Sequence, residues 1–171
     1  TPYKKGGEYR LWYGNNDYIV NWENDGQEIK NFKDDAGKLR SRPQNTAFYF
    51  HESISWNDTT ATGKIAFRYQ NADFIFNASG PCVFSKNHLP YLFALLNSIV
   101  SQKLLEVLAP NMKFEVGQMA LVPIIIKENS QINSSVNECV VLAKTDWDSF
   151  ETSWDFSRHP LLPSQSPATI A

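Results

Sequence analysis

Hydrophobic and polar positions alternate over short distances in the first half of the chain. Five short segments rich in β-branched or aromatic residues are separated by turn residues: 18–22, 47–51, 54–56, 64–70 and 73–77. This pattern is typical of a meander of short strands. The chain before residue 46 is more polar and is punctuated by glycines, which predicts short strands and loops. Residues 23–38 are predicted to be a loop or a short surface helix.

A single long helix is predicted over residues 90–108. Pro90 lies in its first turn, Pro110 follows its end, and apolar side chains recur between them at helical spacing. Because its apolar coverage is broad, we expect this helix to be buried.

Two further strands are predicted after the helix, over residues 113–116 and 119–126. Pro123 would place the second strand at a sheet edge or a bulge, because proline cannot donate to a strand ladder. Together these elements predict an α+β fold: a strand-rich mixed or antiparallel sheet with one long buried helix and peripheral short helices.

The length of 171 residues fits one compact domain. Residues 1–140 are expected to form it, residues 141–162 an acidic and aromatic connecting segment, and residues 163–171 a disordered tail. No signal peptide opens the chain and no apolar run approaches the length of a membrane span. With only two cysteines, we expect a soluble, cytoplasmic protein without a membrane partner.

Charge limits the kind of partner. Sixteen Lys and Arg against eighteen Asp and Glu give a net charge of −2, which excludes a polybasic nucleic-acid binder. Any affinity for nucleic acid must therefore be local.

The most concentrated candidate chemistry lies in residues 38–45. Lys38, Arg40, Arg42, Gln44 and Asn45 all fall within this octapeptide. Arg can bond guanine through two parallel hydrogen bonds, Gln and Asn can do the same to adenine, and Lys can hold phosphate oxygens. The alternative is a solvated turn closed by a proline.

Aromatic residues beside basic or amide residues occur elsewhere in the first seventy positions. Trp12 and Tyr69 could stack on bases or sugars. Lys64 and Arg68 share one face if residues 64–70 form a strand, and that face could meet phosphate. The same composition also suits recognition of protein or carbohydrate.

Enzymatic motifs are sparse. The sequence contains no HExxH, GxSxG, phosphate-loop or CxxC motif, so it predicts no catalytic residue, metal ligand or cofactor site. One loose match remains: Asp17 followed by Glu28 and Lys30 fits the spaced carboxylates and lysine of Mg²⁺-dependent nucleases. Solvated loop charges are the alternative.

Several specific strings resemble the PglX family, the adenine-specific DNA methyltransferases of bacterial BREX phage-defence systems. The resemblance covers residues 9–162 and is carried by these segments: 12–26, 40–45, 63–69, 74–76, 78–81, 96–98, 114–117 and 146–156. In that family, and in related type I and type IIG restriction-modification enzymes, the corresponding region resembles a target-recognition domain.

The resemblance implies that residues 1–140 select a DNA sequence within a larger enzyme. The partners would be double-stranded DNA, the catalytic methyltransferase domain of the same parent chain and, as a further possibility, other defence-system proteins. This sequence lacks the Asn/Asp-Pro-Pro-Tyr/Phe motif and the glycine-rich loop for S-adenosylmethionine. The fragment is therefore expected to be non-catalytic, with S-adenosylmethionine serving the parent enzyme.

The expected DNA contacts divide into three groups. Base edges fall to Arg40, Arg42, Gln44 and Asn45; phosphates to Lys38, Lys64 and Arg68; and a sugar or base to Trp12 or Tyr69. Two other classes stay open: a protein-interaction module of a defence complex, and the Mg²⁺-dependent nuclease fragment.

Overall fold

Strands in the described part of the chain are short and fall into two sheets. The computed structural model describes residues 1–127 and 129–162. In the first sheet β1 (Pro2–Lys4) lies in the middle, antiparallel to β2 (Tyr18–Ile19) and parallel to β5 (Ile75–Phe76). This sheet is therefore mixed.

The second sheet is antiparallel. Its central strand β3 (Ser53–Ser55) pairs with β4 (Arg68–Gln70) on one side and with β6 (Cys82–Val83) on the other. The strand predicted over residues 47–51 is wrong, because the chain forms a 3-10 turn there, η1 (Thr46–Phe48). Asn45, in the left-handed conformation with φ 56°, turns the chain into η1.

Two helices replace the single helix predicted over residues 90–108. α2 (Leu89–Asn97) and α3 (Ile99–Leu108) meet at a bend of 69°. Ser98 is extended, and its Oγ accepts a hydrogen bond from the Ser101 N–H, so it caps a new helix instead of continuing the old one. Over the described residues, no single helix is long and apolar enough to cross a bilayer, although α2 and α3 together reach that length across their bend.

The core lies where α2 and α3 meet β3 and the segment that leads into β4. Its innermost side chains are Ile54, Trp56, Ile65, Phe67, Phe93, Leu105 and Phe114. The Trp56 indole donates to the Phe114 carbonyl at 2.8 Å, which satisfies its only polar group. Each large side chain buried here contributes about 1.5–3 kcal/mol to the free energy of unfolding.

The strands predicted over residues 113–116 and 119–126 are also wrong. The region holds the short helix α4 (Val116–Met119) and otherwise irregular chain. Phe114 and Val122 are buried, but Ile125 is 82% exposed, so the apolar run that suggested a buried strand has no sheet to join. The α+β class is confirmed, while these elements within it are corrected.

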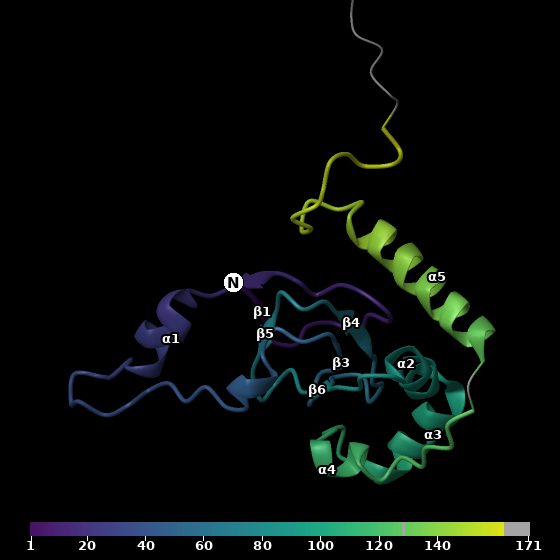
Figure 1. Ribbon diagram of the computed structural model, residues 1–171, viewed down its shortest axis with the longest axis horizontal. Coiled ribbons are helices and arrows are strands. Elements are labelled where there is room, and N and C mark those ends of the chain that lie inside the picture. Colours follow the sequence, from purple (N-terminus) through teal and green to yellow (C-terminus); the bar gives the residue numbers. More distant parts are fainter. Residues whose placement is uncertain (128, 163–171) are drawn as a thin grey trace, which may run out of the picture.

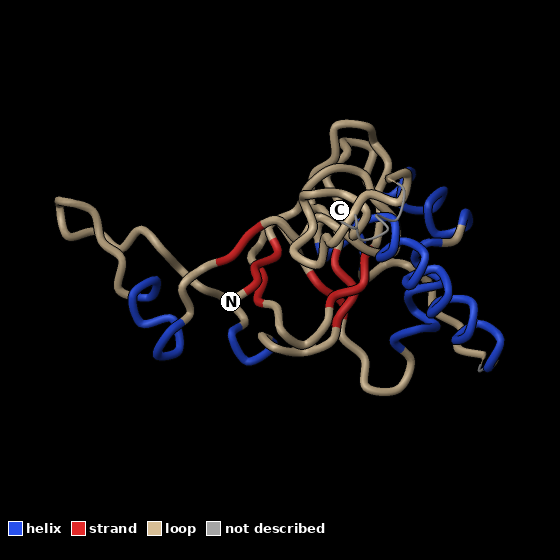
Figure 2. Tube along the Cα trace, turned by 90° about the horizontal axis from the view of Figure 1, so that it is seen from above, coloured by secondary structure: helices blue, strands red, loops and turns tan. Residues whose placement is uncertain are grey.

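Helices α2 to α5 gather on one side of the sheets, and α1 (Glu23–Lys30) with the loop that follows it projects from the other (Figures 1 and 2). α5 (Ser130–Trp147) packs against α2, so the division expected at residue 140 falls inside a helix. The tail expected over residues 163–171 lies outside the described residues.

The acidic and aromatic segment that begins in the last turn of α5 contacts the strand-rich body. Asp146 accepts a hydrogen bond from Arg10 at 2.8 Å, and the Trp154 ring stacks on Phe74 with centroids 6.4 Å apart. These contacts hold Asp146 near the loop that carries Arg10, and Trp154 near Phe74, the residue before β5.

Candidate functional site

Residues 32–45 leave the body as a hairpin and return along its surface (Figure 1). The Arg40 N–H donates to the Phe32 carbonyl at 2.8 Å, and the Asp34 N–H donates to the Lys38 carbonyl at 3.0 Å. Gly37, with φ 78°, closes the turn in a conformation that favours glycine. The hairpin places Lys38 near its projecting end and Arg40 at its base.

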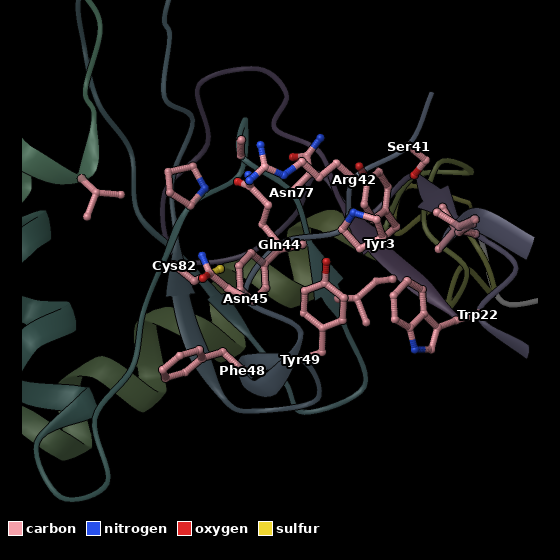
Figure 3. Close-up of a pocket in the computed structure, with 18 of the residues that line it drawn as sticks. Tyr3, Trp22, Ser41, Arg42, Gln44, Asn45, Phe48, Tyr49, Asn77 and Cys82 are labelled. Atoms are coloured by element: carbon pink, nitrogen blue, oxygen red, sulfur yellow. The ribbon is translucent and has the colours of Figure 1, made fainter. Parts of the chain in front are cut away.

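The returning segment forms one wall of a cleft of about 790 Å³. The opposite wall comes from β1, β5, β6 and η1. Arginine, amide and aromatic side chains dominate the lining: Arg40, Arg42, Gln44, Asn45, Asn77, Tyr3, Trp22, Phe48, Tyr49, Phe76 and Phe84. In Figure 3 the Tyr49 hydroxyl points into the cleft, toward the segment that carries Gln44.

Five aromatic rings form a continuous series along this cleft. Trp22 contacts Tyr49 and Tyr49 contacts Phe76, each pair with centroids 5.1 Å apart, while Phe84 contacts Phe76 at 5.8 Å and Phe48 at 5.2 Å. The two Tyr49 contacts are edge-to-face, a geometry that stabilises a ring pair by about 0.5–1.5 kcal/mol, and the two Phe84 contacts are tilted. Phe48 remains 51% exposed, so the series ends at an accessible ring.

Trp22 owes its position to a glycine. Gly26 has φ 69°, and a Cβ atom at this residue would lie 2.6 Å from the Trp22 ring. The Lys30 ammonium lies over the Trp22 ring, 5.4 Å from the ring centroid. Any larger residue at position 26 must push the indole out of this packing.

The electrostatics of the cleft are one-sided. Arg40 and Arg42 are the only charged residues among those described that line it. Arg40 Nε lies 3.9 Å from the Asp34 carboxylate, whereas Arg42 has no ion-pair or hydrogen-bond partner within the described ranges. Burial raises the pKa of Tyr3 and Tyr49, so both phenols stay neutral and can donate hydrogen bonds.

The structure therefore brings together four of the predicted site residues: Arg40, Arg42, Gln44 and Asn45. It also places an aromatic wall beside them, and the sequence analysis did not predict which residues form that wall. The available signal was the high aromatic content of the chain, 13%. Lys38 belongs to the same hairpin and is exposed, but it lies beyond the lining.

Arg68 occupies a different environment from the one predicted. Its side chain is 0% exposed, and its guanidinium donates to the Asn57 side chain and, at 3.4 Å, to the Arg10 carbonyl. Burial lowers the pKa of Arg68 to about 10, which still leaves it charged at neutral pH. A phosphate contact needs a cation at the surface, so Arg68 is corrected to an internal structural residue.

Three other predicted contacts stand apart from the cleft lining. The Tyr69 hydroxyl donates to the Glu52 carboxylate, and Trp12 packs edge-on against Phe93 with centroids 4.8 Å apart. Lys64 is exposed, on the turn before the buried segment 65–67. Their contacts with DNA stay predictions.

Two residues of the nuclease hypothesis, Glu28 and Lys30, are engaged with neighbours. Glu28 accepts a hydrogen bond from the Asn21 amide at 2.8 Å, and Lys30 pairs with Asp25 at 2.6 Å. Over the described residues, no group of three or more His, Cys, Asp or Glu side chains is close enough together to hold a metal ion. The observed geometry gives this hypothesis no support.

Comparison with known proteins finds similar sequences within adenine-specific methyltransferases. No protein-family model matches the chain. It is 37% identical over 164 residues to the adenine-specific methyltransferase PglX of Lacticaseibacillus casei strain Zhang, and 32% identical over 165 residues to the adenine-specific methyltransferase BrxX of Escherichia coli O9:H4 strain HS. Each match covers 94% of this chain but only 14% and 13% of the relative. The chain is thus similar, over nearly its whole length, to one segment of much longer adenine-specific methyltransferases.

Proposed function

We propose that this chain is the DNA sequence-recognition region of a BREX adenine-N6 DNA methyltransferase and is non-catalytic by itself. One observation carries the proposal: the cleft has two arginines as its only charged lining groups among the described residues, beside amides and aromatic rings. Guanidinium and amide groups supply the paired hydrogen bonds that distinguish bases. The absence of lining carboxylates favours an anionic ligand.

Arg42 is the leading candidate for contact with a base. It is exposed and has no partner among the described residues, so its five N–H donors are available without breaking an ion pair. Gln44 and Asn45 are exposed on the same segment and can present paired donor and acceptor atoms to adenine. Arg40 adds a second guanidinium, and Lys38 and Lys64 are proposed phosphate contacts.

The activity of the parent enzyme belongs to the same proposal. The names of the two relatives support an adenine-specific methyltransferase. We propose that its substrate is DNA and that a catalytic domain outside this segment binds S-adenosylmethionine. Residues 1–140 would then choose the site, while the distant domain performs the chemistry.

Sequencing of methylated DNA tests the proposal directly. Cells would carry the full-length parent methyltransferase as wild type, as Arg40→Ala with Arg42→Ala, or with residues 1–140 exchanged for those of a relative. We expect the exchange to change the methylated sequence and the double variant to relax it at one or two positions. Lys103→Ala, an exposed cation on α3, serves as the matched control. An unchanged methylation pattern in both altered enzymes would refute the recognition role.

A protein-interaction module is the second candidate, and one feature favours it. The outer side of α3 exposes Ile99, Val100 and Val107 by 71%, 71% and 76%. Exposed apolar groups on one helix are a common basis for protein contact. If Val100→Lys abolished assembly with other defence proteins while the methylated sequence stayed unchanged, this region would have an additional docking role.

A further inference from the structure

We propose that the cleft receives a single unstacked nucleobase, which enters between the Arg42–Asn45 segment and the aromatic wall. This inference rests on the proposed function, because it names the part of the DNA that the same cleft would hold. Here the base has left the duplex, whereas groove recognition contacts the edges of bases that stay paired. The volume of the cleft and the side chains that line it support this inference.

The first argument concerns size. A cleft of about 790 Å³ is within the range of sites that enclose a small ligand, roughly 300–1,000 Å³. An intact double helix is far too wide to enter such a space, since its major groove alone is about 12 Å across. A duplex could touch Arg42 and Gln44 on the rim, but it would leave the rings behind them without a ligand.

The second argument concerns the rings. In a duplex the faces of the bases are covered by their neighbours in the stack, so an aromatic wall has nothing flat to pack against. An unstacked base exposes its face and stacks readily on aromatic side chains. Phe48, 51% exposed at the end of the ring series, is the most accessible partner for such a base.

The third argument concerns the polar groups that face the same space. Gln44 and Asn45 provide amides, and the neutral phenol of Tyr49 provides a hydroxyl donor. These groups match the Watson–Crick edge of a base, which is free only when the base has left its pair. Arg42 lines the same cleft, so its guanidinium can also bond the edge of that base.

The experiment compares single-stranded oligonucleotides of equal length and equal phosphate number, with and without bases. Fluorescence anisotropy measures binding of the whole chain to a normal strand and to an abasic strand. We expect the normal strand to bind about 5- to 150-fold more tightly, the range for stacking of one base. Equal affinity for the two strands would overturn the inference.

Phe48→Ala and Phe48→Leu identify the stacking ring. Leucine keeps an apolar side chain and protects folding but has no flat face, so both variants should lose most of the preference for the normal strand. Phe32→Ala is the matched control, since Phe32 is 59% exposed and does not line the cleft. A preference that survives in both Phe48 variants, with folding confirmed by circular dichroism, would contradict the inference.

A duplex arm separates this inference from the proposed function. Duplex binding that weakens in Arg42→Ala, together with equal affinity for normal and abasic strands, would retain sequence recognition and reject the unstacked base. Failure to bind any of the three DNAs would reject both.

Discussion

Two pairs of basic residues in this protein have opposite environments. Lys4 and Arg68 lie inside the body and are each 0% exposed, whereas Arg40 and Arg42 lie in the exposed segment that walls the cleft. All four lie within the first seventy residues, and sequence composition alone does not distinguish one pair from the other. Burial gives the first pair a structural role and leaves the second pair available to a ligand.

The inner pair bonds carbonyl and amide oxygens rather than acidic partners, and the buried Arg68 Nε has no hydrogen-bond partner among the described residues. Lys4 Nζ donates to the Gly14 and Asn15 carbonyls at 2.9 and 3.3 Å, and Arg68 bonds the Asn57 side chain. Burying an ion is costly unless hydrogen bonds replace its water. The Lys4 bonds connect β1 to the loop around Gly14, and the Arg68 bond connects β4 to Asn57, which follows β3.

Arg68→Ala should produce the largest effect. Removing the guanidinium leaves a void and deprives the Asn57 oxygen of its donor, so the free energy of unfolding should fall by about 2–5 kcal/mol. Urea denaturation measures it. Arg42→Ala, an exposed substitution, should stay within about 0.5 kcal/mol of wild type. Similar losses of unfolding free energy in the two variants would contradict the different structural roles of the inner and outer pairs.

Arg42→Ala should instead weaken DNA binding. We expect a loss of about 1–3 kcal/mol for the recognised duplex and relaxed discrimination at one base pair, because paired hydrogen bonds to one base are lost. Titration of the parent enzyme with duplexes that differ at single positions provides the measurement. A uniform loss across all sequences would make Arg42 a phosphate contact and leave base recognition to its neighbours.

Lys4 predicts a dependence of stability on pH. Burial, together with the nearby Arg68 charge, lowers the pKa of Lys4 well below 10.5, so the unfolded chain keeps this proton to higher pH than the folded chain. Stability contributed by this group must therefore rise with pH up to 10.5, by at most about 1.4 kcal/mol per pH unit.

Comparison with Lys4→Met tests this contribution, because titrating groups that do not interact with Lys4 cancel in the difference. As the pH rises toward 9.0, the free energy of unfolding of wild type should increase relative to that of the variant. Above pH 9.0 Cys82, whose pKa burial raises to about 11, acts in the opposite direction and also responds to the Lys4 charge, so the comparison ends at that pH. Parallel pH curves would show that Lys4 titrates in the folded state as it does in the unfolded chain.

Lys38→Ala should have the smallest effect and should not alter specificity. Loss of one phosphate contact lowers the slope of log affinity against log salt by about 0.9 and weakens all duplexes alike. Salt titrations of wild type and variant test this, with Lys103→Ala as a control for an exposed lysine outside the hairpin. An unchanged slope would place the DNA away from the hairpin end.

The sequence located the outer pair because its signal is local. Arginines and amides concentrated within residues 38–45 remain neighbours whatever the rest of the chain does, and all but Lys38 among the proposed contacts there line the cleft. The inner pair was not recognisable in the same way. Strand alternation predicted Lys64 and Arg68 on one exposed face, but β4 begins only at Arg68, and both Arg68 and Gln70 are buried.

The sequence by itself determined the α+β class, the apolar helical region and the concentration of arginine and amide side chains in one loop, because these follow from composition and short-range periodicity. Tertiary structure decided the bend at Ser98, the burial of Lys4 and Arg68, and the union of that loop with Tyr3, Phe48 and Asn77 in one cleft. Burial and concavity depend on contacts between residues far apart in the chain, and local sequence patterns do not predict those contacts.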